Sequence, residues 1–176
     1  LSQRILRDHG IEAAYEDVIE RFNAIFFGAN GDGLVLREEW LVNDDLFSRL
    51  AQRHRLSIFT GRRRCDAQIT LHRFAPHWRF APVVCMEDVE NHKPAPDGLF
   101  RIQEELPGTR LFFLGDTIDD ARSAKDAGVA FFGVASKKNP RRAELIDVLN
   151  AQGALAILEN VNEVEAAIDA LIGSDG

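Results

Sequence analysis

The sequence predicts an α/β fold in which a parallel sheet is covered by helices on both faces. From about residue 56 onward, short apolar runs alternate with stretches of helical periodicity. The short runs are apolar throughout, as expected for strands that are buried on both faces. Strands that alternate with helices in this way pair in parallel, and together these observations indicate a Rossmann-like arrangement.

The first segment of the chain is predicted to be helical. Residues 2–9 and 14–27 have helical periodicity, and apolar residues in the second stretch recur at every third or fourth position. The glycine-rich run GANGDG, residues 28–33, then ends the pattern. We therefore expect a first unit over residues 1–38 and a second over residues 39–176.

The second unit is predicted to be a regular succession of helices and strands. Its first helix would be capped by Asn43 or Asp44 and run to about His54. The other helices are expected at 65–74, 97–105, 118–127, 141–152 and 163–172, and the strands at 56–60, 82–86, 111–115, 129–134 and 154–158. Ligands of such sheets bind at the carboxyl ends of the strands, so the residues that follow each strand are the functional candidates.

Three carboxylates, those of Asp116, Asp119 and Asp120, follow the strand expected at 111–115. Carboxylates this close repel one another unless a hard cation such as Mg²⁺ collects their charge. Alternatively, Asp116 caps the next helix and the other two lie in its first turn, where the helix dipole favours negative charge. The cluster alone leaves both interpretations open.

Two further strand ends carry groups that suit a phosphate. Thr60 and Gly61 offer a hydroxyl and an unobstructed backbone N–H to a phosphoryl oxygen, and the adjacent Arg62 could bind an anion bidentately. Lys93 would balance the charge of the carboxylates and of the phosphate. Each feature alone is common in turns or on surfaces, but their occurrence at three strand ends of one sheet indicates a shared site.

The composition argues against several classes of function. The net charge of -7 disfavours nucleic-acid binding, which needs a basic face. No apolar run reaches the roughly 18–20 residues of a membrane span, and the first residues do not form a signal peptide, so a cytoplasmic protein is expected. Cys65 and Cys85 are expected to be packed, reduced thiols, because they lack disulfide or metal-site spacing.

The motifs resemble those of the haloacid dehalogenase-like hydrolase superfamily, in particular its capped, phosphoglycolate-phosphatase-like branch. SIFTGR (57–62) is similar to the second motif of the family, HKPAPDGL (92–99) to the third and FLGDTIDDARSAKDAG (113–128) to the fourth. The resemblance covers about residues 40–135. It implies a parallel-sheet core, a helical cap and Mg²⁺ as the cofactor.

The resemblance also implies a role for each candidate residue. Thr60, with Gly61 and Arg62 beside it, would bind the phosphoryl group, and Lys93 would stabilise charge on the nucleophile and the phosphate. Asp116 would ligate Mg²⁺, Asp120 would ligate it or orient its waters, and Asp119 is a further candidate ligand.

The first motif of the family is missing from the sequence. It is an Asp-x-Asp sequence whose first aspartate attacks phosphorus and whose second acts as general acid and base. The nearest match, NGDGL at 30–34, has asparagine in the nucleophile position and also suits a turn. In the capped branch a helical cap follows the first strand. Residues 1–38 would then be the last part of the cap and its hinge, with the nucleophile upstream of Leu1.

These observations predict Mg²⁺-dependent hydrolysis of a small phosphorylated metabolite through an aspartyl-phosphate intermediate. One alternative is an inactive binding or regulatory domain in which NGDGL is a degenerate first motif. Another is a phosphomutase or dehalogenase of the same superfamily. A small phosphorylated substrate is the expected partner, without nucleic acid or membrane.

Overall fold

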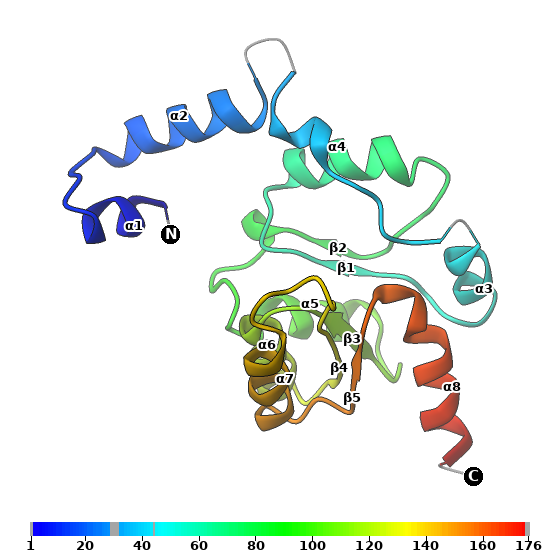
Figure 1. Cartoon of the computed structure of the whole chain (residues 1–176). Helices are drawn as coiled ribbons and strands as arrows, with labels where there is room; N and C mark the ends of the chain where they lie inside the picture. Colours follow the sequence, from blue (N-terminus) through cyan, green and yellow to red (C-terminus); the bar gives the residue numbers. More distant parts are fainter. Residues whose placement is uncertain (1, 29–31, 44, 175–176) are drawn as a thin grey trace. The chain divides into compact units, whose positions relative to one another are not determined.

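The computed structural model of the chain describes residues 2–28, 32–43 and 45–174, which belong to two compact units (Figure 1). The first unit is Leu1–Trp40 and the second is Leu41–Gly176. Among the described helices, none is long and apolar enough to cross a membrane. That the first unit is part of a cap remains a prediction.

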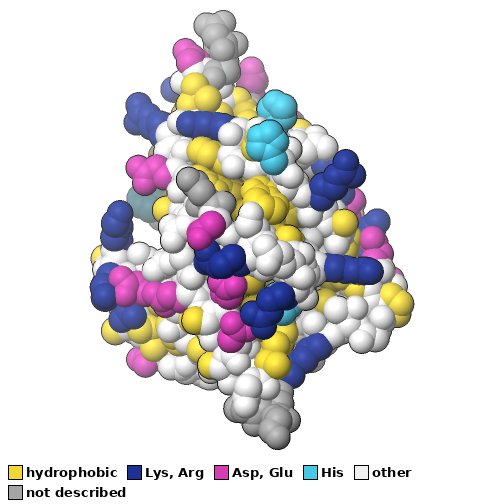
Figure 2. Space-filling view, turned by 90° about the vertical axis from the view of Figure 1, so that its right-hand side faces the viewer, with side chains coloured by type: hydrophobic (Ala, Val, Ile, Leu, Met, Phe, Trp, Pro, Cys, Tyr) yellow, Lys and Arg dark blue, Asp and Glu magenta, His cyan; other side chains and the backbone are white. Residues whose placement is uncertain are grey.

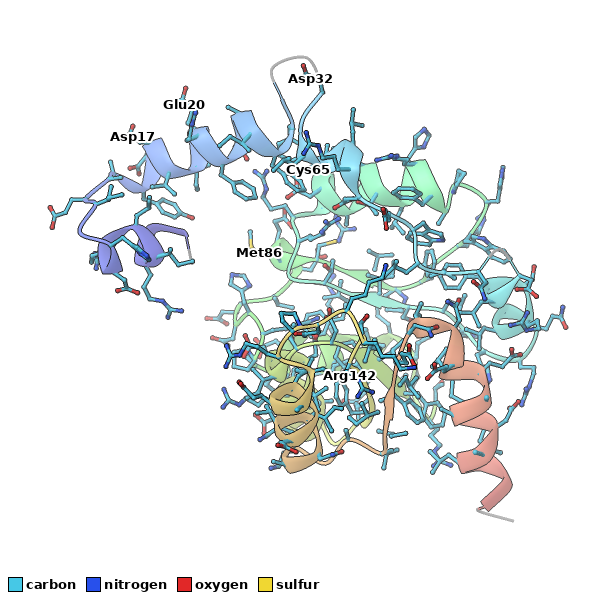
Figure 3. The ribbon with its side chains drawn as sticks, in the orientation of Figure 1. Asp17, Glu20, Asp32, Cys65, Met86 and Arg142 are labelled. Atoms are coloured by element: carbon cyan, nitrogen blue, oxygen red, sulfur yellow. The ribbon has the colours of Figure 1, made fainter. Side chains whose placement is uncertain are left out.

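The first unit contains the two predicted helices, α1 (Ser2–Asp8) and α2 (Tyr15–Phe26), and a short 3-10 helix, η1 (Leu34–Arg37). Helix α2 is amphipathic, and its acidic residues Asp17 and Glu20 project away from it (Figure 3). No residue of α2 is buried. Of the NGDGL segment, Asn30 and Gly31 lie outside the described residues, and Leu34 begins η1 instead of following a strand.

The second unit alternates helices and strands as predicted. Its elements in chain order are α3 (Leu46–Arg53), β1 (Ile58–Phe59), α4 (Arg64–Phe74), β2 (Val83–Val84), η2 (Met86–Asp88), α5 (Asp97–Glu105), β3 (Phe112–Gly115), α6 (Ile118–Ala127), β4 (Ala130–Val134), α7 (Arg142–Ala151), β5 (Ala156–Leu158), η3 (Val161–Glu163) and α8 (Val164–Ser174). The bounds of α5 and α6 match the prediction, whereas β1 and β2 are each shorter than predicted.

The predicted cap of α3 is wrong at Asn43. The N-cap position is Asp45, which makes no side-chain capping bond. Asn43 instead forms a turn before the helix, where its carbonyl oxygen accepts the Leu46 N–H at 3.1 Å and its own N–H donates to Asn162 Oδ1 at 2.7 Å. The other predicted cap, Asp44, lies outside the described residues.

The five described strands pair in parallel, as predicted, but in two separate sheets. One sheet is β1–β2, and the other has the order β3–β4–β5. Within the described part of the chain, β1 and β3 therefore each have one unpaired edge. Every residue of β3 is only half-buried, whereas the three central residues of β4 are buried. Interior strands of a parallel sheet are normally buried on both faces, so β3 has the burial of an edge strand.

Helices cover both faces of the β3–β4–β5 sheet, with α6 and α7 on one side and α8 on the other (Figure 1). Phe131 and Phe132 are neighbours on β4 and point to opposite faces, because side chains alternate along a strand. Phe131 belongs to a core cluster with residues of α5, α6 and α7, and Phe132 belongs to a second cluster with residues of α3 and α8. Strand β4 thus lies at the centre of the second unit.

Two ion pairs join α3 to α8 on the outer face of the second unit. Arg49 Nε donates to Glu165 Oε2 at 2.6 Å, and Arg53 Nη2 donates to Asp169 Oδ1 at 2.6 Å. The bond to Arg53 lowers the pKa of Asp169. Basic and acidic side chains are interspersed over this face (Figure 2). Because solvent screens such exposed pairs, the apolar contacts beneath them contribute most of the α3–α8 attachment.

Candidate functional site

Lys93 connects the end of β1 to the start of α6. Its ammonium Nζ donates to the carbonyl oxygen of Phe59 at 3.0 Å and to Asp120 Oδ1 at 2.7 Å. The side chains of Lys93 and Asp120 are 16% and 9% exposed, so little solvent screens their attraction. The structure therefore brings together two candidate residues, Lys93 after β2 and Asp120 after β3, at the last residue of β1.

Asp120 is held by a capping box at the start of α6. Thr117 is the N-cap: its Oγ1 accepts the Asp120 N–H at 3.1 Å, and Asp120 Oδ2 accepts the Thr117 N–H at 3.1 Å. The Asp116 N–H also donates to Asp120 Oδ2, at 3.3 Å. Asp116 is therefore not the cap, which corrects that interpretation of the acidic cluster. Both carboxylate oxygens of Asp120 already have protein partners.

Two glycines leave space for this arrangement. A Cβ atom at Gly115 would lie 2.5 Å from Cβ of Asp120, and one at Gly98 would lie 2.2 Å from a ring carbon of Phe59. Atoms cannot approach this closely, so a larger residue at either position would displace a neighbour of Lys93. Gly115 and Gly98 thus permit close approach of site residues.

Replacing Gly98 by alanine should lower the free energy of unfolding by about 1–3 kcal/mol, because the buried Phe59 ring would have to move away from α5. Gly173→Ala is the control. Gly173 also lies in a helix but has open space at its Cβ position, so helix propensity should make that change neutral or stabilising. Urea denaturation of both variants tests this, and equal effects would mean that the Phe59 ring accommodates the methyl group.

The carboxylates of Asp116 and Asp119 have no hydrogen-bond or ion-pair partner among the described residues. Asp116 is exposed, and Asp119 is half-buried. In the described part of the chain, no three His, Cys, Asp or Glu side chains are grouped so that they could hold a metal ion. Mg²⁺, however, commonly takes one or two protein carboxylates and completes its octahedron with water and phosphate. The free Asp116 carboxylate at the end of β3 fits such a site.

The phosphate-binding candidates after β1 form a tight turn. Thr60 Oγ1 accepts the Arg62 N–H at 3.1 Å, which leaves the hydroxyl proton of Thr60 available for donation. Gly61 is exposed, with no atom within 4 Å of its Cβ position. Arg62 Nη1 donates to Thr70 Oγ1 at 2.7 Å, so its guanidinium lies against α4. Thr60 thus keeps a hydroxyl donor available, whereas the Arg62 guanidinium is held against α4 through one of its N–H donors.

The two cysteines lie close to strand ends. Cys65 lies near the start of α4, the helix that follows β1, and Cys85 directly follows β2. Figure 3 labels Cys65 and Met86, the residue after Cys85, near the same end of the β1–β2 sheet. Both cysteines are free, as predicted. Cys65 is exposed, so the prediction that it is packed is wrong; Cys85 is buried, and burial raises the pKa of its thiol.

Two aromatic residues of the site, Phe59 and Phe113, were not predicted. Lys93 Nζ lies 4.2 Å from the ring centroid of Phe59 and 5.1 Å from that of Phe113, within the range of cation–π attraction. The two centroids are 6.0 Å apart. Both residues were assigned to apolar strands, and their contact with Lys93 depends on tertiary structure. In the sequence, the one indication that Phe59 lies at the site is its position directly before Thr60.

The chain is similar to known proteins in sequence and in fold. The sequence profile of a family described as haloacid dehalogenase-like hydrolase matches residues 42–134. A phosphonoacetaldehyde hydrolase-like protein from Oleispira antarctica has a TM-score of 0.69 at 20% identity, over 94% of this chain and 68% of that chain. A candidate β-phosphoglucomutase from Thermotoga maritima has a TM-score of 0.70 at 20% identity, over 94% of this chain and 74% of that chain.

A third solved structure, of a candidate phosphoglycolate phosphatase from Lactobacillus plantarum, has a TM-score of 0.62 at 17% identity. It covers 93% of this chain and 87% of that chain. No curated protein matches the chain by sequence. At these identities the solved structures establish the fold, and the profile match over residues 42–134 carries the sequence relationship.

Proposed function

The chain belongs to the haloacid dehalogenase-like hydrolase family, and from this premise we propose that it acts as a Mg²⁺-dependent phosphomonoester hydrolase on a small phosphorylated metabolite. The observation that carries the proposal is the nearly buried Lys93–Asp120 pair between the ends of β1 and β3. A fixed cation beside a free carboxylate and a hydroxyl donor suits a phosphoryl group together with its metal.

The geometry supports a division of labour among these residues. The ammonium of Lys93 has three N–H donors. Two of them bind the Phe59 carbonyl and Asp120, which leaves one for a phosphoryl oxygen. Thr60 would donate its hydroxyl to a second phosphoryl oxygen. Asp116 would hold Mg²⁺, which when bound neutralises charge on the phosphate. Asp120 fixes Lys93, so direct ligation by Asp120 would compete with bonds that it already makes.

We propose further that the attacking aspartate lies upstream of Leu1 in the natural protein, on a strand between β1 and β3. The unpaired edges of these two strands support this position, as does the half-buried state of β3. Unpaired apolar edges favour aggregation, and an added strand would cover both of them. That strand would end near Lys93, where an ammonium could stabilise the charge of a nucleophilic carboxylate and of the phosphate that it attacks.

The natural full-length protein should hydrolyse a generic aryl phosphate with Mg²⁺ and lose at least about 100-fold of this rate after chelation, because the metal supplies charge stabilisation worth several kcal/mol. Release of the coloured alcohol measures turnover, and restored Mg²⁺ should restore it. Absence of metal-dependent turnover would instead support a non-catalytic binding domain. Turnover of a haloacid, or transfer of the phosphoryl group within a sugar phosphate, would support the other chemistries of the family.

A further inference from the structure

Ser123 is a fully buried polar residue that none of the motif assignments explains. Its side chain is inaccessible to solvent, and its Oγ donates to the carbonyl oxygen of Ala95 at 3.0 Å. Ala95 lies two residues after Lys93, in the loop between β2 and α5. Burial of a hydroxyl lowers stability unless the hydroxyl is hydrogen-bonded, so the bond to Ala95 explains how Ser123 can be buried.

Ser123 lies three residues after Asp120, on the same face of α6. The loop of residues 89–96, here called the Lys93 loop, therefore contacts α6 through two polar bonds. Lys93 bonds Asp120 and Ala95 bonds Ser123, about one helical turn apart. The loop is also closed on itself, because the backbone N–H and side-chain Nδ2 of Asn91 both donate to Asp97 Oδ2 at 3.0 Å. A loop that is closed in this way can dock on α6 as one piece.

We propose that Ser123 is a positioning residue that docks the Lys93 loop on α6 and so fixes the ammonium at the phosphate site. The proposal rests on the proposed function for its catalytic meaning, although the docking itself is independent of turnover. With Ser123 in place, the main chain beside Lys93 is anchored, and Asp120 then has to orient only the side chain. Without the hydroxyl, the ion pair would be the one polar bond described between the loop and this helix.

Lysine labelling tests the docking directly. The chain has four lysines, and Lys93 is largely buried, so it reacts with an amine reagent mainly when its loop opens. In Ser123→Ala of the natural full-length protein, the labelling rate of Lys93, measured by mass spectrometry, should rise about two- to tenfold, the effect of one lost hydrogen bond on an opening equilibrium. Lys125, Lys137 and Lys138 serve as internal references in the same sample.

Two controls separate docking from general stability. Ser57→Ala removes the same type of serine-to-carbonyl bond at a more exposed place, from Ser57 Oγ to the Ala81 carbonyl oxygen at 3.1 Å, and should leave Lys93 labelling unchanged. The buried Cys85 thiol reports wider opening of the second unit, and its reaction rate should not change in Ser123→Ala. Unchanged Lys93 labelling, or an equal rise at Cys85, would overturn the proposal.

A kinetic measurement connects docking to the proposed reaction. If the natural protein hydrolyses an aryl phosphate, kcat of Ser123→Ala should fall by about tenfold with KM changed by less than about twofold, because a displaced ammonium stabilises the transition state less. An unchanged kcat would overturn the catalytic part of the proposal. If wild-type protein shows no turnover, the proposed function fails, and the labelling result still decides whether Ser123 docks the loop.

Discussion

Replacing Asp120 by alanine should lower the free energy of unfolding by about 3 kcal/mol, because removal of one partner of a nearly buried ion pair leaves the other charge uncompensated. Lys93 would keep the Phe59 carbonyl and the two rings as neighbours but would lose its only described carboxylate partner. Thr117 would also lose its reciprocal capping bond, which weakens the start of α6.

A double-mutant cycle in urea denaturation measures the pair itself. Lys93→Met combined with Asp120→Ala should be more stable than Asp120→Ala alone, because the double variant no longer buries an unpaired ammonium. The exposed pair Arg141–Glu144 is the control, and Glu144→Ala should leave stability unchanged within error, because solvent already screens that pair. Equal effects of Asp120→Ala and Glu144→Ala would mean that Lys93 is solvated and contributes no buried charge.

Asp116→Asn should reduce metal-dependent turnover of the natural protein by about 1,000-fold or more while changing the free energy of unfolding by less than about 0.5 kcal/mol. The Asp116 carboxylate is exposed and has no hydrogen-bond or ion-pair partner among the described residues, so its loss breaks no described contact. Asparagine keeps the shape of the side chain but removes the charge that a hard cation prefers in its ligands.

The rate should be measured over a series of Mg²⁺ concentrations, because a weakened site shifts the half-saturating concentration upward before it abolishes turnover. Asp126→Asn is the matched control: Asp126 is an exposed carboxylate in the last turn of α6, at the end of that helix away from Asp116, and the change should leave both rate and metal dependence unaltered. If Asp116→Asn kept full metal-dependent activity, the metal would have to bind without this carboxylate.

The helices were predictable where the sequence marks both of their ends. Helix α6 begins at Ile118 within a Thr117-x-x-Asp120 capping box and is capped at its other end by Gly128, whose φ of 67° lies in the left-handed region that glycine adopts easily. The two strands before β3 were predicted too long, because an apolar run indicates burial but not how many of its residues find a pairing partner. In the β1–β2 sheet, only two residues of each strand pair with the other strand.

The sequence indicated which strand ends carry the candidate residues but not which contacts these residues make. Lys93 and Asp120 are 27 positions apart, and their pairing depends on how the loop after β2 folds over the end of β1. Arg62 was predicted to bind phosphate because of its place beside Gly61, whereas its guanidinium bonds Thr70, eight residues further along. Ser123 is absent from the prediction because a serine within a helix carries no signal of a bond to a distant carbonyl.

The double engagement of Asp120 has a consequence for how the pocket is assembled. Its carboxylate is satisfied by Lys93 on one oxygen and by the start of α6 on the other. The lysine is therefore put in place by folding alone, unlike the ligands of a structural zinc site, which are ordered only when the ion binds. Metal binding would then complete a site in which the ammonium of Lys93 is already in position.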